Sequence, residues 1–170
     1  MGGGVRKASF PPVVDERTQV LVLGSLPGEI SLARAQYYAH PQNQFWRLIG
    51  AVIGAELTHL DYETRLGRLL EARVGLWDVI ATAERAGSLD GAIRAHQPNA
   101  LAELAASLPR LKAIGFNGGT SARIGSKALE GQGGWTLAPL PSSSPAYTKP
   151  FEEKKAAWMT LRSFLDSVKL

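Results

Sequence analysis

The sequence predicts an α/β fold: a three-layer α/β/α sandwich built on a central, mainly parallel four-stranded sheet. Two observations lead to this prediction. Apolar runs of strand length alternate with segments of helical periodicity, as in sheets whose crossovers are helices. Three of the expected strands also end in loops rich in Gly, Asn, Pro or Ser. Because parallel strands end at the same edge of a sheet, these loops should meet there, where open α/β folds bind their ligands.

The first half of the chain carries two strands and two helices. Val20–Gly24 is apolar and ends in glycine, which is typical of a strand buried on both faces. Apolar residues recur at helical spacing over Asn43–Ile53. Asp61 can act as the N-cap of a helix over Asp61–Ala72, whose polar face is rich in Glu and Arg. A short strand is expected within Val74–Ala81, ending near Asp78.

The second half continues the alternation. Pro98 suits the first turn of an Ala/Leu-rich helix over Pro98–Leu108. The other expected elements are a strand over Leu111–Phe116, a helix over Gly119–Leu129, a strand over Trp135–Leu140 and a closing helix over Phe151–Val168. The aromatic stripe of the closing helix should face the core, and its lysines, Lys154 and Lys155, should lie on a solvated face.

Length and composition restrict the kind of protein. The chain has 170 residues, enough for one domain, expected over residues 19–170 after a flexible arm over 1–18. It has no cysteine, which excludes disulfides, thiolate nucleophiles and cysteine-ligated metals. No secretory signal or membrane span is evident, so we expect a cytoplasmic protein, or one of the nucleoid in a bacterium. The net charge of +4 is dispersed, as in a shaped cleft that meets a polyanion.

The first candidate site is the loop after Val20–Gly24, with the sequence GSLPG. It is neither a P-loop nor a GxGxxG fingerprint. It can be read as a simple strand-terminating turn, since Gly and Pro are the usual residues there. In a functional interpretation, Gly24 allows close approach, and the backbone N–H groups of Ser25 and Leu26 bind a carbonyl oxygen of a ligand.

The second candidate site is the segment Tyr37–Asn43. Adjacent tyrosines cannot share one face, so at least one of Tyr37 and Tyr38 should face a cavity or solvent. His40 is a candidate for direct chemistry or a structural hydrogen-bonding residue. Asn43 is either a functional amide or the N-cap of the helix that follows.

Two further loops complete the set. Asn117 follows a buried strand; it suits a turn, and its amide can also donate to and accept from the lactam edge of uracil or hypoxanthine. The loop from Pro141 to Tyr147 contains three successive serines, which can bind phosphate oxygens. A serine nucleophile is not expected, because neither a GxSxG elbow nor a His–Asp pair is evident.

A resident metal is not expected from the sequence either. The three histidines, His40, His59 and His96, have no ligand spacing such as HExxH. The acidic residues form no paired-carboxylate motif; those considered are Glu29, Asp78, Glu84 and Asp90. No cofactor is expected.

Three ordered motifs make the chain resemble the uracil-DNA glycosylase superfamily, and within it the hypoxanthine-DNA (deoxyinosine) glycosylase branch. They are GSLPGEISLARAQYYAHPQNQFW from Gly24, GLWDVIATAERAGSLDGAI from Gly75 and LPSSSPAYT from Leu140, and FNG from Phe116 supports them. Mismatch-specific relatives have GINPG, whose Asn orients the water. Leu26 occupies that position here, and the resemblance assigns the role to the Asn of HPxN, which is Asn43.

The resemblance implies a monofunctional glycosylase that excises deaminated bases from flipped nucleotides and leaves an abasic site. In this interpretation Asn43 positions the water and His40 donates to the leaving base. Gly24, Ser25, Leu26, Tyr38 and Asn117 bind the base; Pro141, Ser142, Ser143, Ser144, Pro145 and Tyr147 meet the DNA, with Tyr147 as a wedge. No lysine lies in the motifs to form a Schiff base.

The expected partner is therefore DNA containing deaminated bases, bound by a monomer without metal or membrane. Two alternatives remain from the sequence: an enzyme for uracil or thymine mismatches, and a catalytically silent DNA-binding module that recognises lesions.

Overall fold

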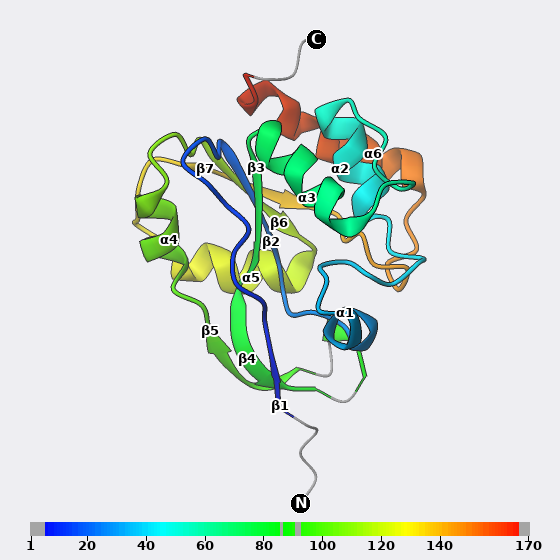
Figure 1. Ribbon diagram of the computed structural model, residues 1–170. Coiled ribbons are helices and arrows are strands. Elements are labelled where there is room, and N and C mark those ends of the chain that lie inside the picture. Colours follow the sequence, from blue (N-terminus) through cyan, green and yellow to red (C-terminus); the bar gives the residue numbers. More distant parts are fainter. Residues whose placement is uncertain (1–5, 86, 91–92, 167–170) are drawn as a thin grey trace, which may run out of the picture.

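The computed structural model describes residues 6–85, 87–90 and 93–166. Its centre is a parallel four-stranded sheet with the order β3-β2-β6-β7 (Figure 1). The strands are β2 (Val20–Gly24), β3 (Val74–Asp78), β6 (Ala113–Asn117) and β7 (Thr136–Leu140). The predicted sheet is therefore confirmed, and β3 ends at Asp78, as expected.

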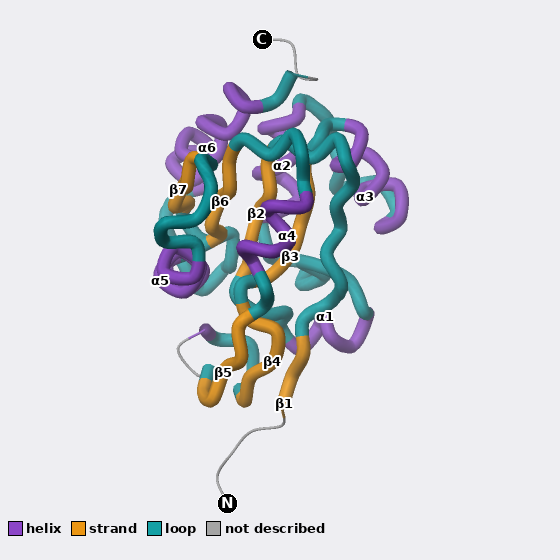
Figure 2. Tube along the Cα trace, turned by 90° about the vertical axis from the view of Figure 1, so that its left-hand side faces the viewer, coloured by secondary structure: helices purple, strands orange, loops and turns teal. Residues whose placement is uncertain are grey.

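Helices cover both faces of this sheet, which confirms the three layers (Figures 1 and 2). One side carries α2 (Phe45–Ile53), α3 (Tyr62–Glu71) and α6 (Phe151–Trp158), and the other carries α4 (Leu101–Ser107) and α5 (Gly119–Ala128). Alternate residues of β2 enter the two cores: Val20 and Val22 pack on the first side, Leu21 and Leu23 on the second. All four are at most 1% exposed, as expected for a strand buried on both faces.

A second sheet, which the sequence did not reveal, lies beyond the carboxyl edge of the first (Figure 2). It is antiparallel, with the order β1-β4-β5, and is formed by β1 (Arg6–Ala8), β4 (Ile80–Glu84) and β5 (Arg94–Pro98). The strand expected within Val74–Ala81 ends at Asp78, as predicted, and Ile80 begins a second strand that was not predicted. The chain leaves the parallel sheet after Asp78, and Val79 N–H donates to the carbonyl of Gly24.

The second sheet corrects two predicted boundaries. The flexible arm predicted over residues 1–18 is wrong for its described part. Arg6–Ala8 pairs with β4, and Val13 bridges to Leu76. Pro98 ends β5 instead of opening a helix, and α4 begins only at Leu101. A proline fits both the end of an edge strand and a first helical turn, so local sequence did not decide between them.

The remaining differences concern one additional helix and the end of the closing helix. The additional helix is α1 (Glu29–Arg34), which follows the GSLPG loop and was not predicted. The closing helix is shorter than expected: α6 ends at Trp158 and a 3₁₀ helix continues over Met159–Phe164, while the predicted end at Val168 lies outside the described residues. Asp61 is the N-cap of α3 and its side chain accepts from Thr64 N–H, as predicted.

Candidate active site

A cavity of about 610 Å³ opens at the carboxyl edge of the parallel sheet. This volume lies in the range of small-molecule sites. Several segments, distant in sequence, line the cavity: Gly24–Ser31, Tyr37 and Tyr38, His40, Asn43, Asp78, Ser88–Asp90, Asn117 and Ser142–Tyr147. The edge position is explained by the strand register, which aligns Gly24 with Asp78 and Asn117 with Leu140.

The cavity brings together the predicted site residues with one exception. Its lining includes His40, Asn43, Gly24, Ser25, Leu26, Tyr38, Asn117, Ser142, Ser143, Ser144, Pro145 and Tyr147. Pro141 does not line it, and its carbonyl accepts a hydrogen bond from the Trp158 indole at 2.9 Å. Pro141 therefore joins the loop to α6.

A chain of hydrogen bonds connects the two candidate amides through Ser143. Asn117 Nδ2 donates to Ser143 Oγ at 2.9 Å, and Ser143 Oγ donates to Asn43 Oδ1 at 2.8 Å. Asn117 Oδ1 also accepts from Ser143 N–H at 2.9 Å. Ser143 is 1% exposed, so its hydroxyl is committed to the two amides.

Asn43 lies one residue before Gln44, the N-cap of α2, so the N-cap role considered for Asn43 is wrong. Its Oδ1 accepts from the backbone N–H of Phe45 at 2.9 Å, where α2 begins, as well as from Ser143. These two bonds use both lone pairs of the carbonyl oxygen. The Nδ2 group makes no hydrogen bond within the described residues, and Asn43 lines the cavity. The helix start therefore holds the amide while its N–H groups remain free for a ligand or water.

His40 is held on one side only. Its Nδ1 accepts from Gln42 N–H at 3.0 Å, and the ring lines the cavity. A nitrogen that accepts a backbone N–H carries no proton, so the proton of the neutral ring lies on Nε2. His40 can therefore present an N–H donor to a ligand.

The two adjacent tyrosines have different environments, as predicted. Tyr37 is buried, packs edge-on against Phe10 and donates to the carbonyl of Pro11 at 3.0 Å. Tyr38 has a backbone φ of +54° and stacks one face of its ring on Phe45, with the centroids 4.0 Å apart. A positive φ in a bulky residue is strained and is typical of functional sites. The Tyr38 hydroxyl is buried without a hydrogen-bond partner in the described structure.

Asp78, at the end of β3, is a site residue that sequence reasoning missed. It is 3% exposed, and its Oδ2 is buried with no hydrogen-bond partner among the described residues. Burial, reinforced by the nearby charge of Asp90 and opposed by Arg85, raises the pKa of Asp78 to about 7. A carboxyl group with this pKa, lining a cavity, is characteristic of functional sites. The sequence signal was its place at the mouth of a strand.

Gly24 provides the space beside this carboxyl group. A Cβ at Gly24 would lie 2.7 Å from Asp78 Oδ1 and 2.8 Å from the Tyr38 hydroxyl oxygen. Both contacts are shorter than side chains tolerate, so glycine is required for Asp78 and Tyr38 to converge at this point of the cavity.

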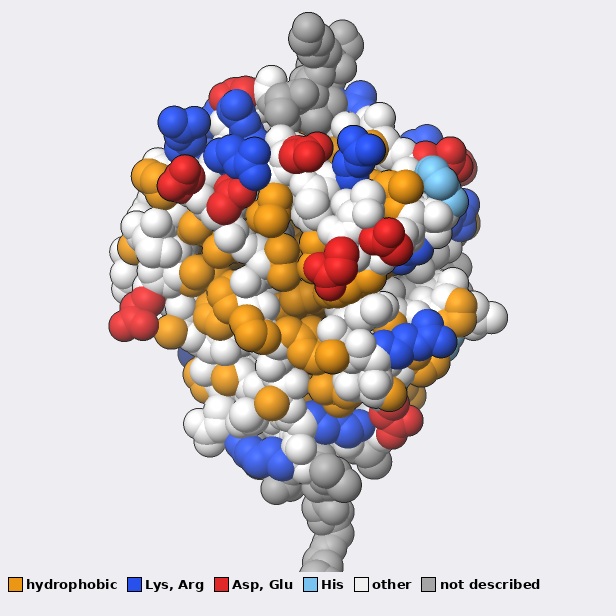
Figure 3. Space-filling model, in the orientation of Figure 1, with side chains coloured by type: hydrophobic (Ala, Val, Ile, Leu, Met, Phe, Trp, Pro, Cys, Tyr) orange, Lys and Arg blue, Asp and Glu red, His pale blue; other side chains and the backbone are white. Residues whose placement is uncertain are grey.

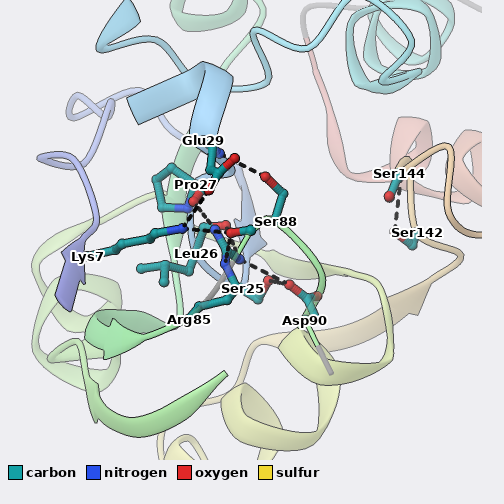
Figure 4. A network of polar contacts seen from close by, with 11 residues as sticks. Lys7, Ser25, Leu26, Pro27, Glu29, Arg85, Ser88, Asp90, Ser142 and Ser144 are labelled. Atoms are coloured by element: carbon teal, nitrogen blue, oxygen red, sulfur yellow. Dashed lines mark hydrogen bonds and ion pairs between the residues drawn. The ribbon is translucent and has the colours of Figure 1, made fainter. Parts of the chain in front are cut away.

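A buried arginine, which the sequence reasoning did not select, holds the GSLPG loop (Figure 4). Arg85 is 1% exposed and donates to the carbonyls of Leu26, Pro27 and Gly87. The Ser25 hydroxyl donates to Asp90 at 2.6 Å, and Asp90 lies 3.6 Å from the Arg85 guanidinium. The backbone N–H groups of Ser25 and Leu26 make no hydrogen bond within the described residues, so they remain available to a ligand.

The serine loop forms the other rim. Its turn is internally bonded. Ser142 Oγ accepts from Ser144 N–H (Figure 4), and Ser144 Oγ accepts from Ala146 N–H. Lys154 is 1% exposed and donates to Gln44 Oε1 and to the Ser144 carbonyl, so its predicted solvated position is wrong. The aliphatic part of Lys154 can be buried because its ammonium group is hydrogen-bonded to these two acceptors.

Two large apolar side chains are exposed at the cavity, Leu89 at 63% and Tyr147 at 44%. On the face seen in Figure 3, hydrophobic side chains form a central band and Lys and Arg lie in separate groups around it. This view agrees with the dispersed charge inferred from the sequence.

No helix in the described part of the chain is both long enough and apolar enough to cross a membrane. Within the same residues, no three His, Cys, Asp or Glu side chains converge as a metal site would require.

Comparison with known proteins gives consistent matches over most of the chain. The model of the Uracil DNA glycosylase superfamily matches residues 11–162. A hypoxanthine DNA glycosylase of Methanosarcina barkeri is 39% identical over 154 residues, covering 91% of this chain and 96% of that protein. A hypoxanthine DNA glycosylase of Methanosarcina acetivorans is 40% identical over 152 residues, with coverages of 89% and 95%.

A solved structure agrees with this relationship. The solution NMR structure of a candidate uracil DNA glycosylase from Methanosarcina acetivorans superposes with a TM-score of 0.84 at 38% identity. The superposition covers 94% of this chain and 99% of that one.

Proposed function

The chain belongs to the uracil DNA glycosylase superfamily, and from this premise we propose that it hydrolyses the N-glycosidic bond of deoxyinosine in DNA, releasing hypoxanthine. The observation that carries the proposal is the cavity itself: Asn43, His40 and the unbonded loop N–H groups converge on one space large enough for a nucleobase. The two curated relatives near 40% identity favour hypoxanthine as the base.

The target nucleotide must leave the duplex to reach this cavity, at a cost of a few kcal/mol. Phe45 stacks on one face of Tyr38 and fixes its ring, so Tyr38 meets the flipped base with its hydroxyl group in the cavity. Asn117 retains one N–H and one lone pair beyond its bonds to Ser143, which suits the lactam edge of hypoxanthine.

Asn43 positions the hydrolytic water in this proposal. Its Oδ1 is occupied by Phe45 and Ser143, so the free Nδ2 group holds the water by donating to its oxygen. A carboxamide cannot act as a general base. Holding the water is sufficient if the bond to the base is largely broken before the water attacks.

The departing base is stabilised by fixed donors. The candidates are the Nε2–H group of His40 and the backbone N–H groups of Ser25 and Leu26, which Arg85 holds in place through the loop carbonyls. Preorganised donors of this kind are each worth on the order of 10²–10³ in rate. No lysine belongs to the cavity lining in the described part of the chain, which favours a monofunctional enzyme.

The serine loop meets the DNA backbone. Ser142 and Ser144 remain near the surface and are assigned to the phosphates together with Pro145, whereas the buried Ser143 supports the loop by holding the amides. Tyr147, exposed at the rim, is the wedge that fills the space left in the duplex. Because one chain carries all these residues, we propose that the protein acts as a monomer, in the cytoplasm or the bacterial nucleoid.

A panel of duplexes tests the proposal. Single-turnover excision is measured on DNA containing inosine, uracil, xanthosine or a G·T mismatch, with hot alkali to cleave abasic sites. We expect inosine to react fastest and strand cleavage to require alkali. Faster excision of uracil or mismatched thymine would assign the enzyme to a sibling specificity. Binding of inosine DNA without an alkali-labile product would instead identify a silent lesion-binding module.

A further inference from the structure

The floor of the cavity contains two polar atoms that the proposed mechanism leaves unused. Asp78 Oδ2 and the Tyr38 hydroxyl are the two buried side-chain atoms without a hydrogen-bond partner in the described structure. Both groups line the cavity and converge on Gly24. Buried polar groups in native proteins are almost always hydrogen-bonded, so a convergent unbonded pair indicates a place where a ligand supplies the partners.

No ion pair to Asp78 is formed among the residues that the structure describes. Arg85, whose charge acts on Asp78, directs its guanidinium to the carbonyls of Leu26, Pro27 and Gly87 and to Asp90. A buried carboxylate kept for stability would be paired or hydrogen-bonded. Asp78 therefore lies in the cavity as a carboxyl group that is readily protonated, and its buried Oδ2 has no hydrogen-bond partner among the described residues.

We propose that Asp78 is the general acid of the reaction and donates its proton to N7 of the departing purine. This inference rests on the proposed function. Asp78 and the Tyr38 hydroxyl are neighbouring groups at Gly24. The Hoogsteen edge of hypoxanthine offers two neighbouring acceptors, N7 and O6, and N7 is the one that can take up a proton as the base leaves. The Tyr38 hydroxyl, beside Asp78, donates to O6.

The proton and electron balance is complete with water as the only co-reactant. As the C1′–N9 bond breaks, its electron pair stays with the base, and the proton of Asp78 moves to N7, so the base leaves as neutral hypoxanthine. Water attacks C1′, its oxygen forms the new hydroxyl of the abasic sugar, and its spare proton passes to solvent. The Asp78 carboxylate then takes a proton back from solvent.

The electrostatic surroundings of Asp78 agree with this role. Asp90, from the segment after β4, disfavours the ionised form, Arg85 favours it, and burial outweighs both, so that the pKa is raised to about 7. Tyr37 and Tyr38 face it from the segment before α2, and burial raises the pKa of each phenol, so both stay neutral. A general acid works best when its pKa lies near the operating pH.

The test compares two enzymes on two substrates. Single-turnover excision is measured at pH 6 for the wild type and Asp78→Asn, on DNA containing deoxyinosine or 7-deaza-2′-deoxyinosine, which lacks N7. General acids contribute 10²- to 10⁴-fold. We therefore expect Asp78→Asn to slow inosine excision at least about 100-fold while changing the already slow 7-deaza reaction less than about threefold. A purely structural role would slow both reactions equally and would overturn the inference.

The pH profile gives a second measurement. The wild-type rate on inosine should be flat below about pH 6 and fall about tenfold per unit above pH 7, and Asp78→Asn should lack this falling limb. His40 also lines the cavity, so the limb should persist in His40→Gln if it belongs to Asp78. Loss of the limb in His40→Gln, or its survival in Asp78→Asn, would assign it elsewhere and contradict the proposal.

Two controls keep the results separable. Glu63→Gln makes the same charge change on an exposed side chain of α3, outside the cavity lining, and should retain the wild-type rate. Thermal unfolding and binding of inosine DNA test whether Asp78→Asn is folded. Undiminished excision by Asp78→Asn would overturn the general acid and leave the glycosylase proposal intact. Failure of the wild type to excise inosine would overturn both.

Discussion

Two sides of the cavity differ in whether their polar groups are hydrogen-bonded. We call the side formed by Asn43, Ser143 and Asn117 the wall, and the side formed by Asp78 and Tyr38 the floor. On the wall, Asn43, Ser143 and Asn117 are linked by hydrogen bonds, and the hydroxyl between them is buried and committed at both ends. On the floor, Asp78 and Tyr38 approach the same glycine, and each has a buried oxygen without a partner in the described structure. The Ser143 bridge between the two amides is thus formed without a ligand, whereas the buried oxygens of Asp78 and Tyr38 have no partner among the described residues.

This difference suggests different roles for the two sides: the wall holds side chains in position, and the floor binds the ligand. A connected network fixes the orientation of its amides because rotation of one breaks bonds to the others. An unbonded buried group costs free energy in the empty protein and recovers it when a ligand supplies the partner. We therefore expect variants on the wall to lose geometry and stability, and variants on the floor to lose activity without losing stability.

The largest effect is expected at the end of the wall that faces the substrate. Asn43→Ser should slow single-turnover excision of inosine about 10²- to 10³-fold, because the N–H groups that hold the water are removed. The serine hydroxyl can still accept from Phe45 N–H, so the start of α2 is kept. A near-wild-type rate with unchanged unfolding would show that Asn43 serves only the helix.

On the floor, Asp78→Asn should raise stability at alkaline pH. The folded-state pKa of about 7 exceeds the ordinary value of 3.8, so the carboxyl group favours folding below pH 4, and this contribution is lost as pH rises to 7. Relative to the wild type, Asp78→Asn should gain on the order of 2–4 kcal/mol between pH 4 and pH 8, measured by urea unfolding. Parallel stability curves for the two proteins would show that Asp78 is ionised throughout.

A variant at Ser143, in the middle of the wall, should lose stability, whereas Asp78→Asn should gain it. Ser143→Ala removes the donor to Asn43 and the acceptor for Asn117, and should lower the free energy of unfolding by about 1–3 kcal/mol. Excision should slow about tenfold, since the amide of Asn43 loses one of its two anchors. Ser143→Thr should restore both properties.

The neighbouring serine provides the matched control for Ser143→Ala. Ser142 Oγ accepts only a local hydrogen bond from Ser144 N–H, so Ser142→Ala should cost less stability in the same unfolding assay. Equal losses in the two variants would mean that the bridge between the amides contributes nothing of its own.

The smallest effect on stability and binding is expected at the Tyr38 hydroxyl, the second polar group of the floor. Tyr38→Phe removes a buried hydroxyl without a partner while keeping the ring that stacks on Phe45. Stability should change by less than about 1 kcal/mol, in either direction, while affinity for inosine DNA falls a few-fold. The first is read by urea unfolding and the second by fluorescence anisotropy. A loss of several kcal/mol would reveal a partner for the hydroxyl inside the fold.

Much of the fold was predictable because its signals are local. The apolar run of β2, the periodicity of α2 and the cap at Asp61 each act within a few residues, and all three occur as expected. The second sheet was not predictable in this way. β1 and β5 are short, and β5 contains a proline that also suits a helix start; both become strands through pairing with β4.

The sequence by itself determined the strands and the main helices of the central three layers, the family, and the loops at the carboxyl edge that carry Asn43, Asn117 and the serines. Only the tertiary structure decided which of those side chains are committed and which are free. The buried bridge of Ser143, the buried Arg85 beneath the loop and the unpaired Asp78 all depend on partners more than fifty residues away or on their absence. The physical reason is that burial and hydrogen bonding, which set the charge of Asp78 and the orientation of Asn43, belong to the packed chain and to no local segment of it.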